Sequence, residues 1–186
     1  MQELTSQPVN VLLLFAGAVF LAAVVRGFTG FGFSALVVTT MFFIMPVSQI
    51  VPVVYALEVV ASLQMLKSVW RQVDIRIFLL LAAGAVIGTP LGQYILLALT
   101  ATQSKQLASI LVLILVVLVA SGFRIKSGNK ALFFFVVGLL GGCINGAIAM
   151  GGLVISALLM ATSLSVASIR ASLVVILFFL GVYSQA

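Results

Sequence analysis

Eight apolar runs follow one another along the chain and leave little room for charged residues between them. The runs cover residues 9–25, 31–45, 50–66, 77–99, 107–123, 131–144, 153–161 and 166–183. Of the 186 residues, 64% are hydrophobic and 6% are charged, whereas about a quarter of the residues of a soluble domain are charged. So few charges cannot cover a surface that faces water. The sequence therefore predicts an all-α polytopic membrane protein, because a membrane β-barrel would show a two-residue alternation instead.

The composition also excludes several kinds of active site. The chain has no histidine, one cysteine (Cys143) and three acidic residues. It cannot form a Ser-His-Asp triad, a Cys-His pair or a zinc site, and three acids leave little for a hard cation. We therefore expect no enzyme activity, no cofactor and no metal site.

Two short breaks between apolar runs carry most of the net charge of +6. Their basic residues are Lys67, Arg71, Arg76, Arg124, Lys126 and Lys130. Such clusters follow the positive-inside rule, so we interpret them as cytoplasmic loops and expect no nucleic-acid partner. Two spans separate the clusters, which puts both on one side of the membrane and the N-terminus outside.

Two glycine-rich breaks are related by an offset of 119 residues. The offset aligns four pairs of identical residues: Gly27 with Gly146, Gly32 with Gly151, Val47 with Val166 and Ile50 with Ile169. Five apolar segments precede the second copy, and because this number is odd the two copies enter the membrane from opposite sides. An inverted repeat with interrupted helices is typical of secondary transporters.

We expect a first repeat at residues 1–123, with a broken helix pair and three spans, and a second repeat at residues 124–186. The second repeat has no counterparts of the fourth and fifth runs, so we expect it to be incomplete. Each glycine-rich break, at residues 26–34 or 145–152, joins either two short spans or the arms of a re-entrant hairpin. The sequence does not choose between these.

The two breaks supply the candidates for a substrate site. Glycine frees the backbone from helical geometry, and the N–H groups where a helix restarts attract an anion. The candidate substrate-binding residues are Arg26, Gly27, Thr29, Gly30, Gly32, Ser34, Asn145, Gly146, Gly151, Gly152 and Arg170. Alternatives stay open for all of them: the glycines suit close helix packing, a hydroxyl can bond its own helix, and Arg170 can reach the membrane interface.

Glu58 is the only acid inside a long apolar run. Ionisable residues within a membrane are costly and usually face a cavity or a partner. Glu58 is therefore either the candidate for carrying a coupled proton or one half of a buried ion pair with Arg26 or Arg170.

Three blocks of sequence carry a resemblance to a known family: RGFTGFGFSALVV, PVSQIVPVVYALEVVASL and GLLGGCINGAIAMGGLVISALLMATSLSVASIRASL. Together with GAVIGTPLGQYIL, they make the chain similar to the TauE/SafE family of sulfite and organosulfonate exporters over nearly its whole length. The resemblance implies a secondary carrier of small sulfur-containing anions in the bacterial inner membrane. It also implies that residues 26–32 and 145–152 form the substrate site.

We therefore expect a secondary transporter of sulfite, sulfonates or related anions, coupled to protons or to the membrane potential. The alternatives are a non-transporting membrane scaffold or assembly subunit, and a carrier or channel for another small anion. The expected partners are a small anionic substrate and the lipid bilayer. A homo-oligomer also stays open, since a second copy of the chain could complete the site.

Overall fold

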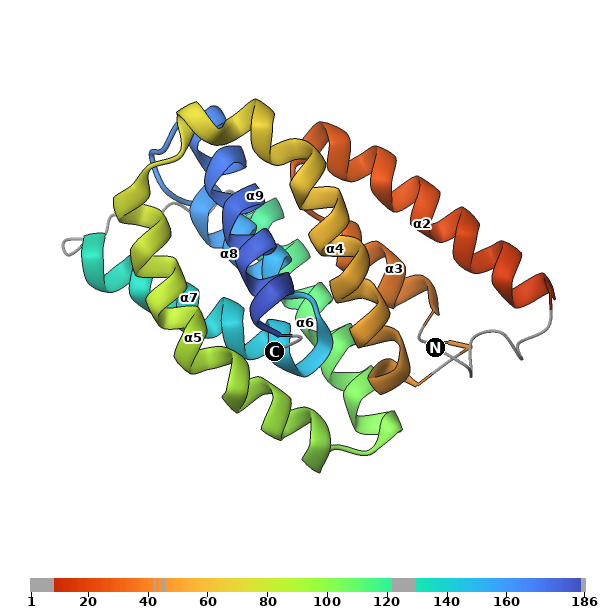
Figure 1. Cartoon of the computed structure of the whole chain (residues 1–186). Helices are drawn as coiled ribbons and strands as arrows, with labels where there is room; N and C mark the ends of the chain where they lie inside the picture. The colour runs from red at the N-terminus through yellow and green to blue at the C-terminus, as the bar shows by residue number, and fades with distance from the viewer. Residues whose placement is uncertain (1–8, 42, 45, 122–129, 185–186) are drawn as a thin grey trace.

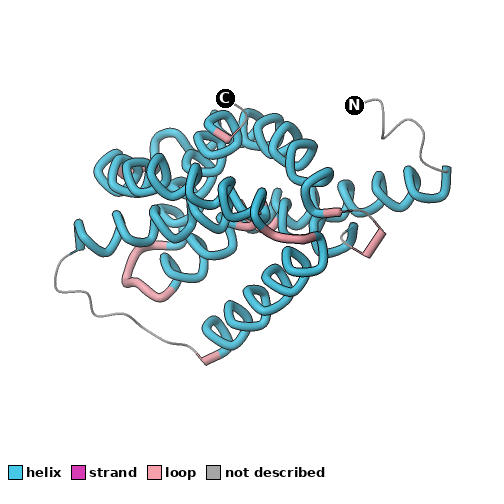
Figure 2. Tube along the Cα trace, turned by 90° about the horizontal axis from the view of Figure 1, so that it is seen from below, coloured by secondary structure: helices cyan, strands magenta, loops and turns pink. Residues whose placement is uncertain are grey.

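The structure of the chain is a computed structural model that describes residues 9–41, 43–44, 46–121 and 130–184. These residues form a bundle of helices joined by short loops, with no strand among them (Figure 1, Figure 2). The helices are α2 (Val9–Thr29), α3 (Phe33–Met41), α4 (Val47–Val69), the 3-10 helix η1 (Trp70–Gln72), α5 (Ile75–Ala98), α6 (Ala101–Ala120), α7 (Lys130–Ile148), α8 (Gly151–Met160) and α9 (Val166–Tyr183). The eight α-helices coincide with the eight apolar runs, which confirms the predicted all-α fold.

Five helices of the described chain are long and apolar enough to cross a membrane: α2, α4, α5, α7 and α9. The short helices α3 and α8 have 9 and 10 residues. At 1.5 Å per residue they reach about 15 Å, half of the roughly 30 Å of a hydrocarbon core. Each glycine-rich break therefore joins a helix of spanning length to a short helix. This arrangement differs from both predicted alternatives, two short spans and a re-entrant hairpin.

The breaks themselves are shorter than the sequence predicted. Only residues 30–32 and 149–150 lie outside the paired helices. Arg26 and Asn145 lie inside the last turns of α2 and α7, and the other predicted break residues are helical as well: Gly27, Thr29, Ser34, Gly146, Gly151 and Gly152. Backbone groups within a membrane have to hydrogen-bond internally, so a helix continues through glycine and polar residues for as long as it can.

The helix boundaries repeat with the offset found in the sequence. Three pairs of equivalent ends are 119 residues apart: Thr29 and Ile148, Met41 and Met160, and Val47 and Val166. The matched boundaries support the internal repeat. The division into residues 1–123 and 124–186 stays a prediction, because its boundary falls outside the described residues.

The closest helix contact joins α5 to α7, each of which presents a row of glycines four residues apart. The rows are Gly84, Gly88 and Gly92 on α5 and Gly138, Gly142 and Gly146 on α7. A Cβ atom added to Gly88 would lie 2.8 Å from the backbone nitrogen of Cys143, and one added to Gly142 would lie 2.7 Å from the Cα of Ala85. The two backbones therefore touch where any side chain would hold them apart.

Helices α5 and α7 run parallel, because the contacts advance along both in the same direction. The backbone that faces Gly84 is at residues 135–139, and the backbone that faces Gly92 is at residues 143–147. The first residues of both helices therefore lie at one end of the bundle. Arg76 and Lys130 lie near these helix starts, as expected of two basic clusters on one side, whereas Arg124 and Lys126 fall outside the described residues.

The starts of α5 and α9 follow from local sequence. The carboxylate of Asp74 caps α5 and accepts hydrogen bonds from the amides of Arg76 at 2.9 Å and Ile77 at 3.2 Å. The hydroxyl of Ser165 caps α9 and accepts from the amide of Ser168 at 3.2 Å. Such caps satisfy amides that the first helical turn leaves free.

Candidate functional site

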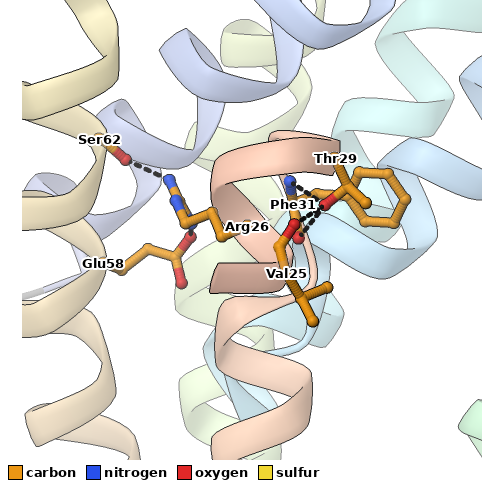
Figure 3. A network of polar contacts seen from close by, with 6 residues as sticks. All are labelled: Val25, Arg26, Thr29, Phe31, Glu58 and Ser62. Atoms are coloured by element: carbon orange, nitrogen blue, oxygen red, sulfur yellow. Dashed lines mark hydrogen bonds and ion pairs between the residues drawn. The ribbon is translucent and has the colours of Figure 1, made fainter. Parts of the chain in front are cut away.

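A charged pair is buried where the end of α2 meets α4. Arg26 is 1% exposed and Glu58 is 3% exposed. Nη1 of Arg26 forms an ion pair with Oε1 of Glu58, and Nη2 donates a hydrogen bond to the hydroxyl of Ser62 at 2.6 Å (Figure 3). Of the alternatives that the sequence left for Glu58, the structure contains the ion pair with Arg26.

The pairing partners share one face of α4. Tyr55, Glu58 and Ser62 follow the spacing i, i+3, i+7, which places residues in one stripe along a helix. All three are buried, with 4%, 3% and 0% of their surface exposed. Sequence reasoning missed Tyr55 and Ser62, although their spacing from Glu58 is a readable signal of a shared polar stripe.

The pair does not use all of its hydrogen-bonding capacity. Within the described chain, Nε of Arg26 and Oε2 of Glu58 are buried and have no hydrogen-bond partner. Leaving a buried polar atom unbonded costs about 1–3 kcal/mol, and more for a charged group. The site therefore offers one strong donor and one strong acceptor to a molecule that reaches it.

The first break adds backbone groups and a second guanidinium to this pair. Nη2 of Arg170, on α9, donates to the carbonyl of Gly27 at 2.8 Å. A Cβ added to Gly30 would lie 2.8 Å from Cγ of Arg170, so this side chain packs directly on the break. By contrast, a Cβ added to Gly27 or Gly32 would meet nothing within 4 Å. The first break therefore lies beside a second guanidinium and has open space at Gly32, whereas Gly27 lies on the exposed surface of α2.

The two hydroxyl candidates lie on either side of the first break. The hydroxyl of Thr29 bonds to the carbonyls of Val25 at 2.9 Å and Phe31 at 2.7 Å (Figure 3). The Thr29 hydroxyl therefore bonds to backbone carbonyls at the end of its own helix, as expected if it has a local structural role. Ser34 is buried in the first turn of α3.

The second break is packed more tightly than the first. The side-chain amide of Asn145 donates to the hydroxyl of Ser184 at 3.3 Å. A Cβ on Gly146 would lie 2.9 Å from the backbone nitrogen of Gln93, on α5. A Cβ on Gly151 would lie 2.5 Å from Cβ of Asn145. These two glycines are close-packing positions in this structure.

Gly152, the remaining candidate, faces a side chain rather than backbone. A Cβ added there would lie 2.7 Å from Cδ2 of Leu177, on α9. The structure thus brings Arg26, Glu58, Gly27, Gly30 and Arg170 together around the first break. Asn145 is connected to them through α4, because its carbonyl accepts a hydrogen bond from the hydroxyl of Tyr55.

A comparison with models of protein families matches residues 15–186 to the family described as Sulfite exporter TauE/SafE. The chain belongs to this family. The match confirms the resemblance found in the sequence, and it makes the chain a membrane protein of a sulfur-anion exporter type. A search of curated proteins and a search of solved structures find no match.

The residues matched to the TauE/SafE family include both breaks and every candidate site residue. Membership therefore applies to the part of the chain that holds the buried Arg26–Glu58 pair.

Proposed function

We propose that this chain is a secondary carrier of small sulfur-containing oxyanions such as sulfite, with Arg26 as the anion contact and Glu58 as the carrier of a coupled proton. The observation that carries the proposal is the Arg26 guanidinium, which is buried in the last turn of α2 beside the first break. A guanidinium offers paired N–H donors that match the oxygens of an oxyanion. Sulfite and sulfonates each present several such oxygens.

The ion pair supplies a reason for coupling to protons. Glu58 occupies the guanidinium that an oxyanion would bind, so anion and carboxylate compete for the same donors. Protonation of Glu58 removes its charge and releases Arg26. Anion binding then takes up one proton, and the apparent affinity rises as the pH falls. The other charged side chain at this break is Arg170, whose guanidinium bonds the Gly27 carbonyl.

Backbone groups at the breaks are the proposed further contacts. Helices α3 and α8 start directly after the breaks, and their first N–H groups favour an anion. Gly30, Gly32, Gly151 and Gly152 are the proposed positions for these contacts, with Gly27, Thr29, Ser34, Asn145, Gly146 and Arg170 around them. The space beside Gly32 favours entry at the first break.

We also propose the bacterial inner membrane as the location, with the N-terminus outside. The basic residues at the end of α4 and the starts of α5 and α7 lie at one end of the bundle. The positive-inside rule assigns such residues to the cytoplasmic face.

Sulfite flux into proteoliposomes tests the function. The chain as it stands is expected to take up labelled sulfite in a saturable manner, faster at lower pH. Arg26→Gln combined with Glu58→Gln removes both charges together, so no buried charge is left unpaired, and flux is expected to fall to that of empty vesicles. Arg71→Gln, the same change at an exposed arginine, is the matched control and keeps full flux. Full flux in the double variant contradicts the role of Arg26.

The second candidate function is a membrane scaffold without transport. The close backbone packing at Gly146 and Gly151 favours it, because these glycines have a structural use that needs no substrate. The same reconstitution separates the two functions. A folded chain that moves no sulfite, sulfate or sulfonate at any pH would favour the scaffold.

A further inference from the structure

The two breaks begin with residues that both have a positive φ angle. Gly30 and Ala149 are 119 residues apart and have φ angles of 86° and 57°. Each donates its amide to the carbonyl four residues earlier, Arg26 or Asn145, at 2.7 Å. Positive φ at a non-glycine residue is uncommon, so the surroundings of Ala149 hold it in place.

At the second break, the holding group is Tyr55 on α4. Its hydroxyl donates to the carbonyl of Asn145, the same carbonyl that accepts the amide of Ala149. Both groups are buried, with 4% of each residue exposed. Tyr55 belongs to the first half of the chain, and the break that it holds belongs to the second half.

At the first break, the holding group is Arg170 on α9. The amide of Phe31 bonds to the hydroxyl of Thr29 at 3.3 Å, and the carbonyl of Gly27 accepts from Arg170 at 2.8 Å. Last-turn carbonyls have no partner within their own helix, so Arg170 supplies one. Here a residue of the second half holds a break of the first half.

Helices α4 and α9, which carry the two holding residues, pack side by side in the bundle (Figure 1). A Cβ added to Gly181 on α9 would lie 2.8 Å from Cγ2 of Val59 on α4. On α4, Tyr55 is three residues from Glu58 and shares its face. One helix therefore contacts the Arg26 site through Glu58 and the second break through Tyr55.

We infer that Tyr55 and Arg170 are positioning residues, whose crossed bonds tie both helix breaks to the α4–α9 pair. A change at the Arg26–Glu58 pair then reaches the second break through α4. The use of this coupling in transport rests on the proposed function, whereas the coupling itself does not.

Amide hydrogen exchange of the purified full chain, without substrate, tests the inference in four proteins: the unchanged chain, Glu58→Gln, Tyr55→Phe and the double variant. Glu58→Gln is expected to speed exchange at residues 147–150 about fivefold when Tyr55 is present, the size of one buried neutral hydrogen bond. In the Tyr55→Phe background it is expected to change nothing there. Equal acceleration in both backgrounds, or none in either, overturns the inference.

Tyr183→Phe is the matched control, because its hydroxyl also donates to a backbone carbonyl, that of Val86, at 3.1 Å. It is expected to leave exchange at residues 147–150 unchanged. An acceleration there as large as the roughly fivefold change expected from Glu58→Gln would show a general loss of stability and would overturn the assigned role.

Arg170→Gln provides a second test, which does not depend on whether the Tyr55 variants fold. It is expected to speed exchange at residues 27–31 about tenfold, the size of a hydrogen bond from a charged group, and to leave residues 147–150 unchanged. Arg71→Gln is its control. No change at the first break, or equal change at both, overturns the crossed arrangement. Because no substrate is present, these results are independent of the flux measurements.

Discussion

The buried pair of Arg26 and Glu58 is a costly way to join two membrane helices. Taking two charges out of water carries a large desolvation penalty, and an apolar pair of similar volume is often at least as stable. The pair also leaves Nε of Arg26 and Oε2 of Glu58 without partners in the described structure. Stability alone does not account for such a pair, which favours a use in anion binding.

Breaking the pair on one side is expected to destabilise the protein, and removing both sides is expected to restore it. Arg26→Met leaves the Glu58 charge buried alone, which costs about 3–5 kcal/mol. The further change Glu58→Leu should return the free energy of unfolding to within about 1 kcal/mol of the original, because contacting residues are not additive. Unfolding titrations in mixed micelles measure both, with Lys67→Met, at an exposed position, as control. A double variant as unstable as the sum of the single changes contradicts the assignment.

Sequence patterns identified both members of this pair and left Arg26 and Arg170 open as the partner of Glu58. Glu58 stands out as the only acid inside a long apolar run, and Arg26 stands out as the charged residue at the first break. The choice between Arg26 and Arg170 as the partner of Glu58 depends on which helices pack together, and the sequence does not contain that information in a readable form. Tyr55 and Ser62 were missed because single hydroxyls are common in membrane helices and usually bond locally.

Among the helices, glycine has two uses that look alike in sequence. Gly30 and Gly32 have φ angles of 86° and 89° and let the backbone turn between α2 and α3. Gly88 and Gly146 instead lie within helices and bring α5 and α7 into backbone contact. The four-residue spacing of the helical glycines indicates close helix packing. Which helix packs against them depends on the tertiary structure, because a second row of glycines has to face the first.

Adding one methyl group tests the packing use. Gly88→Ala is expected to destabilise the bundle by about 1–3 kcal/mol, because the new Cβ meets backbone atoms of α7 that cannot turn away. Gly17→Ala is the control on α2, where a Cβ meets nothing within 4 Å. It should be neutral or slightly stabilising, since alanine favours helix over glycine. Thermal unfolding followed by light scattering compares the two, and equal effects would contradict the packing of α5 against α7.

Over the whole molecule, the apolar runs predicted each helix but made the two glycine-rich breaks too long. The sequence predicts breaks that begin at the polar residues Arg26 and Asn145, whereas helices α2 and α7 extend past them to Thr29 and Ile148. A polar side chain does not end a helix in a membrane when other helices supply partners for it, as Glu58 does here. The 119-residue offset of the repeat could be predicted from the sequence, and the helix ends at Thr29 and Ile148 have the same offset.

The parallel packing of α5 and α7 fixes which loops share a side of the membrane. In a Cys143→Ala background, Arg76→Cys and Lys130→Cys are expected to react with an impermeant maleimide from the same side. Thr100→Cys, beyond the far end of α5, should react from the other. In right-side-out vesicles, only Thr100→Cys should be labelled before the membrane is permeabilised.

The pattern of labelling separates the packing from the orientation. Labelling of Arg76→Cys and Lys130→Cys from opposite sides would contradict parallel packing and with it the glycine contacts of α5 and α7. Labelling of both from outside would keep the packing and reverse the orientation, which would remove the positive-inside argument for a cytoplasmic basic end. Protection of both until permeabilisation, with Thr100→Cys labelled, agrees with packing and orientation together, because a 24-residue helix of about 36 Å then separates the two sets of positions.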